Sequence, residues 1–174
     1  LMGRPGLCLW LLAAAGAAAA CGGSEPGVEI PRPERVVLIT IDTLRADHVS
    51  SWGHPIETTP FVDRLAGEGV TFRRTYSQSA TTKPAHSSLF TSLYPMPHGV
   101  LNNSRVLDRE FVTMAERFSE AGYQTAAFVS TDAPLGGNVN QGFQHWDQYT
   151  AEVDVEGGRK LYRPAEETVD AAVG

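Results

Sequence analysis

The hydrophobic and polar positions of this chain follow two alternating periods, which predict strands and helices in turn. Residues 36–41 form a continuous apolar, largely β-branched run between polar neighbours, as expected for a strand buried on both faces. Apolar residues alternate over 70–76, and a second apolar run covers 125–130. These two segments predict further strands.

A first helix is predicted between the first two strands. Pro60 follows a threonine that can cap the helix, and Gly67 or Gly69 can end it. The apolar stripe of this helix consists of Phe61, Leu65 and Ala66.

Two further helical patterns separate the later strands. Residues 84–92 predict a helix that turns Leu89 and Phe90 inward. Thr113 and Glu116 have the spacing of a capping box, which predicts the start of another helix.

The order of strand, helix, strand, helix and strand predicts an α/β fold with a mostly parallel sheet flanked by helices. In such sheets, ligands bind beyond the carboxyl ends of the strands. Asp42 directly follows the first predicted strand, and the residues after Ser130 follow the third. We therefore expect both segments at the ligand-binding edge.

Residues 1–20 predict a signal peptide of the lipoprotein type. Arg4 is followed by the apolar stretch 7–20, which is shorter than the about 20 residues that span a membrane, and small residues precede Cys21. Cys21 resembles the lipidated cysteine of bacterial lipoproteins, which predicts export and a lipid anchor in the membrane of the bacterial cell envelope, on its periplasmic or extracellular face. A plain signal peptide and a membrane anchor are the alternatives. Residues 21–34 are rich in proline and glycine and predict a linker to a domain over 35–174.

Composition excludes several functions. The net charge is −6 and the basic residues form no extended patch, so we expect no nucleic-acid partner. Cys8 lies in the predicted signal, and Cys21 is the only other cysteine. The segment after Cys21 therefore has neither a cysteine zinc site nor a cysteine nucleophile.

Asp42 is the first residue with candidate chemistry. A carboxylate at the end of an apolar run is costly to bury without a partner. One partner is a divalent cation, because carboxylate oxygens are ligands for Ca²⁺, Mg²⁺, Mn²⁺ and Zn²⁺. The alternative is a cap of a turn or helix, while Asp47 is expected to hold the following loop through hydrogen bonds.

Thr82 is the second residue with candidate chemistry. It is placed to act as the N-cap of the helix that follows, and a helix N-terminus stabilises a bound anion. Coordination to a metal or contact with a base could also activate its hydroxyl as a nucleophile. Lys83 and His86 would then act on a bound phosphate or sulfate, and His98 is a further candidate for substrate binding or a hydrogen-bonded loop residue.

Several of these segments together resemble the sulfatase family, within the alkaline phosphatase superfamily. Residues 36–48 are similar to its opening metal-binding strand and loop, and 58–72 to its next helix and strand. Residues 82–95 match its signature segment, which His98-Gly99-Val100 continues. The resemblance spans most of 35–150. It implies a metal-dependent hydrolase or transferase with one or two divalent ions and a small-molecule, glycan or lipid ester as substrate.

Departures from the family pattern concern the nucleophile. The sulfatase signature is Cys-x-Pro-Ser-Arg, whose first residue becomes formylglycine, but here Thr82, Ala85 and His86 take the positions of Cys, Ser and Arg. The β-carbon of threonine carries a methyl group, so oxidation would give a ketone instead of the aldehyde. Thr82 therefore resembles the nucleophile of phosphoryl-transferring relatives, which favours a phosphate over a sulfate ester. Thr43 replaces the family's second aspartate, which removes one expected metal ligand.

The resemblance also concerns the C-terminal part of the chain. Residues 138–146 resemble the loop that follows the family's second strand, and 163–173 predict a helix. The remaining metal ligands of the family lie beyond the position of Gly174. We therefore expect these residues to be the N-terminal portion of a longer catalytic domain, inactive alone. A non-catalytic, lipid-anchored domain with the same fold is the alternative.

Overall fold

The computed structural model describes residues 31–130, 135–148, 151–155 and 158–174, and no side chains over 151–161. The predicted signal peptide, the lipidation site at Cys21 and the linker up to residue 30 lie outside the described residues. The chain divides into two compact units, Leu1–Ile41 and Asp42–Gly174, and each is described by itself.

In the first unit, the predicted strand over 36–41 is not formed. The segment belongs to no helix or strand, and its side chains are strongly exposed, from 50% at Leu38 to 80% at Val37. A continuous apolar strand is stable when neighbouring strands pair with its backbone and other layers cover both faces. The strand pairs among the described residues do not include this segment, so the prediction is wrong for this structure.

The second unit contains a parallel pair of strands. Strand β1 (Ala126–Phe128) pairs with β2 (His145–Asp147), and the Val129 amide continues the pairing by donating to the Asp147 carbonyl at 2.8 Å. The strand predicted over 125–130 is thus confirmed, whereas β2 lies partly in a segment predicted to be a loop. Strands β3 (Ala151–Val155) and β4 (Gly158–Tyr162) form a separate antiparallel hairpin.

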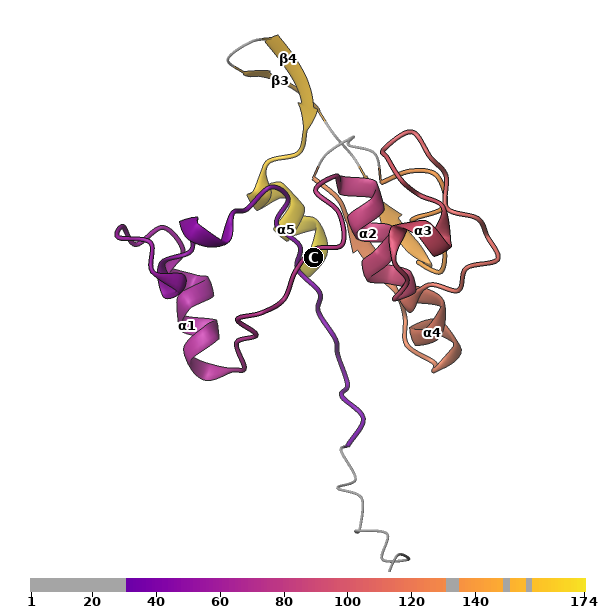
Figure 1. Cartoon of the computed structure of the whole chain (residues 1–174), viewed down its shortest axis with the longest axis horizontal. Helices are drawn as coiled ribbons and strands as arrows, with labels where there is room; N and C mark the ends of the chain where they lie inside the picture. Colours follow the sequence, from indigo (N-terminus) through magenta and orange to yellow (C-terminus); the bar gives the residue numbers. More distant parts are fainter. Residues whose placement is uncertain (1–30, 131–134, 149–150, 156–157) are drawn as a thin grey trace, which may run out of the picture. The chain divides into compact units, whose positions relative to one another are not determined.

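Helices flank the parallel pair, which confirms the α/β class (Figure 1). Two are 3₁₀ turns, η1 (Ala46–His48) and η2 (Ser50–Trp52), and the α-helices are α1 (Pro60–Glu68), α2 (Thr82–Thr91), α3 (Pro95–His98), α4 (Met114–Glu120) and α5 (Ala165–Val173). The predicted helix starts are close to the observed ones. The capping box of α4 is present, since Thr113 Oγ1 accepts from the Glu116 amide and Glu116 Oε2 accepts from the Thr113 amide.

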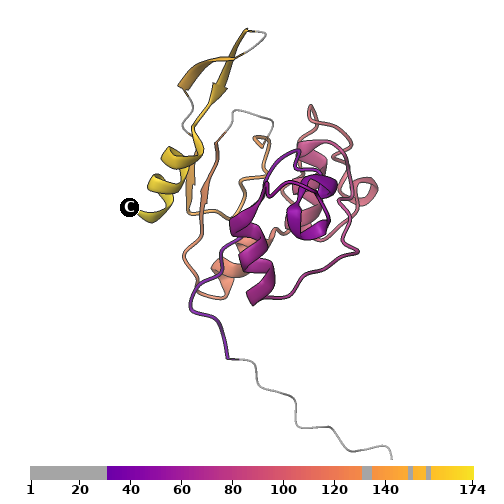
Figure 2. The same ribbon diagram turned by 90° about the vertical axis from the view of Figure 1, so that its left-hand side faces the viewer.

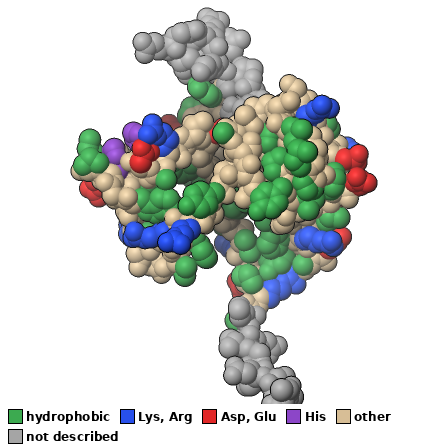
Figure 3. Space-filling model, viewed as in Figure 1, with side chains coloured by type: hydrophobic (Ala, Val, Ile, Leu, Met, Phe, Trp, Pro, Cys, Tyr) green, Lys and Arg blue, Asp and Glu red, His purple; other side chains and the backbone are tan. Residues whose placement is uncertain are grey.

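The other wrong predictions concern apolar residues over 61–89. No strand forms over 70–76, where Val70, Phe72 and Tyr76 are 72–80% exposed. In α1, Phe61 and Leu65 of the predicted stripe are exposed while Ala66 is half-buried, and Leu89 of α2 is exposed as well. Hydrophobic side chains are plainly visible on the surface in Figure 3. Their periodicity predicted burial, but burial depends on a neighbouring layer that these segments lack among the described residues.

The core of the second unit lies between α2 and the parallel strands. Val129, Leu135 and Val139 form a buried cluster, against which Phe90 of α2 and Trp146 of β2 pack. Helix α4 contacts α2, and α5 contacts β1, as Figure 2 also shows for α5 beside the strands. None of the helices that the structure describes is long and apolar enough to cross a membrane.

An ion pair between buried Arg163 and half-buried Asp147 lies at the carboxyl ends of β1 and β2. Arg163 Nη1 lies 2.9 Å from Asp147 Oδ2, with the two side chains 4% and 24% exposed. Arg163 also donates through Nη2 to the Val129 carbonyl and through its amide to the Ser130 carbonyl. A buried charge needs such partners, because an unpaired one is strongly destabilising. The pair therefore fixes the segment before α5 to this edge.

Gly142 allows the turn before β2 to lie very close to α4. Its φ is +88°, and an added Cβ would lie 2.6 Å from Glu116 Cγ and 2.9 Å from the Ala115 carbonyl carbon. We expect Gly142→Ala to lower the free energy of unfolding by about 1 to 3 kcal/mol more than Gly99→Ala does. Gly99 has a similar φ of +72° but nothing within 4 Å of an added Cβ. Urea unfolding followed by circular dichroism measures both losses, and equal losses would contradict the packing argument.

Candidate functional site

The candidate site is built around the first turn of α2. Thr81 has extended backbone angles and makes no side-chain capping bond, and Thr82 is the first helical residue, one position beyond its predicted N-cap place. The first intrahelical bond runs from the Ala85 amide to the Thr81 carbonyl. Amides in the first turn of a helix need partners from elsewhere. Pro84 has no amide hydrogen, so the amides of Thr82 and Lys83 are the ones in this turn that need such partners.

The structure brings the two predicted key residues together. Thr82 Oγ1 donates a hydrogen bond to Asp42 Oδ2 at 3.2 Å, across forty residues of sequence. Asp42 is exposed and Thr82 is half-buried. The hydroxyl proton is thus directed at a carboxylate that solvent and substrate can reach.

Thr82 Oγ1 and Asp42 Oδ2 are also the candidate ligands of the predicted metal site. Hydroxyl and carboxylate oxygens are the hard ligands that Ca²⁺, Mg²⁺ and Mn²⁺ prefer, and such ions take about six or more oxygen ligands. The described residues contain no group of three or more His, Cys, Asp or Glu that could hold a metal ion. The donor set therefore fits a hard cation in kind, but supplies only part of its ligands.

The loop after Asp42 is sharply turned. Thr43 has φ of +58°, a conformation that is strained for a β-branched residue. Arg45 and Asp47 then form an exposed ion pair at 2.6 Å, and the hydrogen bond from Arg45 lowers the pKa of the Asp47 carboxyl. Asp47 thus holds the loop, as predicted.

Asn103 belongs to the site but was missed from the sequence. Its Oδ1 accepts from the Lys83 amide at 2.9 Å, twenty residues away in the chain. Asn102 Oδ1 accepts from the Ser104 amide, forming the turn that presents Asn103. The only available signal was the Asn-Asn-Ser turn itself, which does not indicate a contact with α2.

Lys83 is the buried cation of the site. Its side chain is 7% exposed, and its Nζ lies against Gly137, where an added Cβ would be 3.3 Å away. Among the described residues, no carboxylate forms an ion pair with this ammonium. A buried unpaired cation is costly, so the position favours a bound anion.

His86 lies one turn after Thr82 on α2. Its Nδ1 lies 2.9 Å from the Thr82 carbonyl oxygen, so Nδ1 carries the hydrogen and donates it. The ring also makes an edge contact with Phe90 at 6.0 Å between centroids. Thr82, Lys83 and His86 thus share the first turns of the same helix.

His98 is not part of this group. It is 2% exposed, and its Nδ1 accepts from the Val100 amide at 3.1 Å. Nε2 therefore carries the hydrogen and donates to Ser88 Oγ at 2.9 Å, which also prevents His98 from acting as a base toward Ser88. Ser88 lies six residues after Thr82, about 9 Å along the helix axis. His98 joins α2 to the end of α3, and its contact with substrate stays a prediction.

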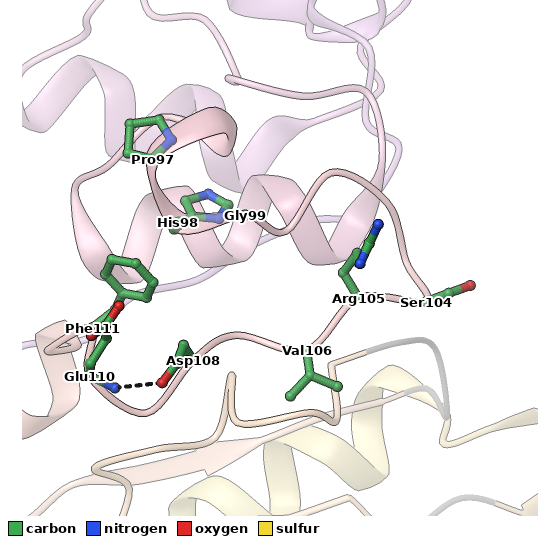
Figure 4. A pocket seen from close by; sticks show the side chains of 9 residues that line it. All are labelled: Pro97, His98, Gly99, Ser104, Arg105, Val106, Asp108, Glu110 and Phe111. Atoms are coloured by element: carbon green, nitrogen blue, oxygen red, sulfur yellow. Dashed lines mark hydrogen bonds between the residues drawn. The ribbon is translucent and has the colours of Figure 1, made fainter.

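An open pocket of about 540 Å³ lies between the C-terminal end of α3, with Gly99, and the segment 104–111 (Figure 4). Arg105, Asp108, Glu110 and Phe111 contribute to its lining. In Figure 4 the Phe111 ring points toward the end of α3, the Asp108 carboxylate lies beside the Glu110 amide, and Val106 points away from α3. The sequence did not indicate this pocket, because it forms between the end of a short helix and a segment outside the helices and strands.

Comparison with known proteins gives a consistent result. The family model described as Sulfatase matches residues 34–172. The N-acetylgalactosamine-6-O-sulfatase of Bacteroides thetaiotaomicron is 38% identical over 106 residues, which are 58% of this chain and 21% of that protein. The multifunctional alkaline phosphatase superfamily protein of Trinickia caryophylli is 34% identical over 98 residues, covering 53% of this chain and 19% of that protein. The chain thus spans about a fifth of the length of these relatives.

A solved structure is also similar. The phosphonate monoester hydrolase of Agrobacterium radiobacter superposes with a TM-score of 0.53 at 33% sequence identity. The match covers 60% of this chain and 23% of that one. It confirms the alkaline phosphatase-like α/β fold.

The burial of His98 predicts a pH dependence of stability. Burial lowers the pKa of the imidazole, so the folded state binds its proton less readily than the unfolded state. Above about pH 6.5 both states are neutral and the stability is fully present. As the pH falls below this value, the free energy of unfolding should decrease, by at most about 1.4 kcal/mol per pH unit from this group.

Urea unfolding between pH 5 and 7 measures this slope. His98→Gln should reduce it, whereas His145→Gln, which removes an exposed histidine, should change it less. Identical slopes for the unmodified chain and His98→Gln would rule out His98 as the cause.

Proposed function

Because the chain belongs to the sulfatase family, we propose that it carries the nucleophile end of an active site that cleaves or transfers an anionic ester, with Thr82 as the nucleophile. The observation that supports this most directly is the hydrogen bond from Thr82 Oγ1 to Asp42 Oδ2. A nucleophilic hydroxyl needs a group that accepts its proton or stabilises the alkoxide. Asp42 lies in hydrogen-bond contact and is open to solvent.

The proposed reaction is a substitution at phosphorus or sulfur. Thr82 Oγ1 forms a bond to the central atom of the ester while the bond to the leaving oxygen breaks. The hydroxyl proton passes to Asp42 or to solvent, and the leaving oxygen takes a proton from water or from His86 when both of its ring nitrogens carry hydrogen. Water or an acceptor alcohol then displaces Thr82 and restores the hydroxyl.

Asp42 and the Thr82 oxygen would hold a divalent cation, with one or two of Ca²⁺, Mg²⁺, Mn²⁺ or Zn²⁺ as candidates. Such an ion, when bound, lowers the pKa of a coordinated hydroxyl and neutralises charge on the ester. The chain's own part is to place the Thr82 hydroxyl beside the Asp42 carboxylate, and the α2–Asn103 contact keeps it there.

Three groups at the start of α2 favour an anion. The helix N-terminus carries partial positive charge, and Lys83 supplies a buried ammonium with no ion-pair partner among the described residues. Asn103 uses its carbonyl oxygen on the Lys83 amide, which leaves its amide NH₂ as a donor. Together they provide the positive field that the equatorial oxygens of a phosphate or sulfate require.

Thr82 favours phosphate over sulfate as the central group. The methyl group on its β-carbon prevents formation of the aldehyde that sulfatases use, so a direct attack by the hydroxyl is the remaining route. The proteins similar to this chain include a sulfatase and a phosphonate monoester hydrolase by name, one named for an ester of sulfur and the other for an ester of phosphorus. We therefore propose phosphate monoesters or diesters as the first substrates to test.

The nucleophile is tested with the complete gene product that contains this chain, assayed with 4-nitrophenyl phosphate, bis(4-nitrophenyl) phosphate and 4-nitrophenyl sulfate in the presence of divalent metals. Thr82→Ala should lower kcat on the preferred ester by about 10³-fold or more, since the attacking oxygen is lost. Thr82→Ser should keep measurable turnover. Thr81→Ala, which removes a neighbouring exposed hydroxyl, is the matched control and should keep near-normal activity. Full activity in Thr82→Ala would refute the assignment.

The role of Asn103 has its own test. Asn103→Asp keeps the oxygen that accepts from the Lys83 amide but removes the NH₂ donor and adds a negative charge. It should raise KM for the anionic ester by about tenfold, the effect of losing a hydrogen bond to a charged group. Gln124→Glu makes the same change at an exposed site before β1 and should leave KM nearly unchanged. If both variants behave alike, Asn103 has no specific role in binding the anion.

A further inference from the structure

We propose that Asp63, in the first turn of α1, is a positioning residue for Asp42, because it fixes the loop that presents the Asp42 carboxylate to Thr82. This inference rests on the proposed function, since it concerns how the group that faces the nucleophile is held in place. It is carried by the hydrogen bonds of Asp63, by the internal bonding of the loop over 45–54 and by the length of the bond between Thr82 and Asp42.

The Asp63 carboxylate joins α1 to the segment that contains η2. Its Oδ1 accepts from the Ser51 amide at 3.0 Å and from the Thr59 hydroxyl at 3.1 Å, and its Oδ2 accepts from the Ser50 hydroxyl. Thr59 Oγ1 in turn accepts from the Ser50 amide at 3.1 Å, and Ser50 Oγ accepts from the Thr59 amide at 3.2 Å. The hydrogen bond from Ser50, followed by those from Ser51 and Thr59, lowers the pKa of the Asp63 carboxyl. A charged acceptor of this kind makes stronger hydrogen bonds than a neutral one, and η2 accordingly lies against α1 (Figure 1).

This network does not cap the helix from which Asp63 comes. Thr59 occupies the N-cap position of α1, but its side chain makes no capping bond. Within the described part of the chain, the bonds to the Asp63 carboxylate come from Ser50, Ser51 and the Thr59 hydroxyl, and none comes from an amide of the first turn of α1. Capping would instead direct a side-chain oxygen at those amides. The bonds of Asp63 therefore indicate a role in holding the loop before α1.

The loop between Asp42 and η2 is held together by its own hydrogen bonds. The Val49 amide donates to the Ala46 carbonyl at 3.1 Å, and His54 Nδ1 lies 3.0 Å from the Asp47 carbonyl oxygen. Because these bonds join η1 to the residues after it, a displacement of η2 is passed on to the residues before η1. Asp42 belongs to those residues.

The bond between Thr82 and Asp42 is too long to hold this loop by itself. It measures 3.2 Å, whereas hydrogen bonds from hydroxyl groups to oxygen are most often about 2.7–2.8 Å long. Asp42 is also exposed, so water competes for its oxygens. The position of Asp42 relative to Thr82 therefore depends on the attachment of the loop to α1, which Asp63 provides.

The test uses the complete gene product and the 4-nitrophenyl ester that it cleaves fastest. Asp63→Asn keeps one carbonyl oxygen but places an NH₂ group where the carboxylate accepts a hydrogen bond. It should lower kcat by about tenfold or more, because a small misplacement of a catalytic group is costly. It should also raise Kd for Mn²⁺, measured by electron paramagnetic resonance of the free ion, by about tenfold, the usual effect of losing support for a metal ligand. Ser50→Ala removes a donor to the same carboxylate and should change both values in the same direction.

Glu68→Gln is the matched control, because it makes the same carboxylate-to-amide change at an exposed site of α1. Both kcat and Kd for Mn²⁺ should stay nearly unchanged in this variant. No change in either value in Asp63→Asn, or the same change in Asp63→Asn and Glu68→Gln, would overturn the inference.

Asp42→Ala separates positioning from a general structural role. In this background, Asp63→Asn should cause little further loss of turnover or of Mn²⁺ affinity, because the group that it positions is absent. Equal losses with and without Asp42 would show that Asp63 only stabilises the fold. If turnover in Asp42→Ala is too slow to measure, the Kd values for Mn²⁺ decide between these two outcomes.

The proposed function and the role of Asp63 can fail separately. Full activity of Thr82→Ala, together with a loss in Asp63→Asn that disappears in the Asp42→Ala background, would refute Thr82 as the nucleophile and keep the positioning role. An inactive Thr82→Ala variant, together with equal losses from Asp63→Asn in both backgrounds, would refute the positioning role alone.

Discussion

The first turn of α2 is stabilised by residues from outside the helix, and the candidate site depends on this constraint. Thr81 does not cap the helix with its side chain, and Pro84 lacks an amide hydrogen. The Lys83 amide is instead satisfied by Asn103, and the Thr82 hydroxyl by Asp42. Two hydrogen bonds between distant segments thus determine where the proposed nucleophile points.

The same helix is anchored along its length. Phe90 packs on the core cluster beside the parallel strands, and Ser88 accepts from the buried His98 at the end of α3. Packed cores have low compressibility and keep side chains in defined rotamers. The core therefore gives the Thr82 end of α2 a rigid support, while Asp42 on its turned loop remains open to ligands. This division between a rigid helix and an exposed loop is typical of binding sites in α/β proteins.

The predictions from the sequence succeeded where local chemistry decides the outcome. The start of α4 follows from the Thr113–Glu116 capping box and that of α1 from Pro60, because both act within one helical turn. The strand at 125–130 was also correct. By contrast, the apolar patterns over 36–41 and 70–76 predicted strands that the described chain does not form. A strand needs partners for its backbone, and the partner is not encoded in the segment itself.

The sequence by itself determined the fold class, the family and the pairing of Asp42 with Thr82, because each rests on an ordered set of residue types. Only the tertiary structure decided which groups surround Thr82. It added Asn103, buried Lys83 against Gly137 and placed His98 between two helices. It also formed the open pocket beside Arg105 and Asp108 from the end of α3 and the segment 104–111. Contacts between residues twenty or more positions apart depend on how loops return to the helix, and no periodicity of hydrophobic or polar residues records that path.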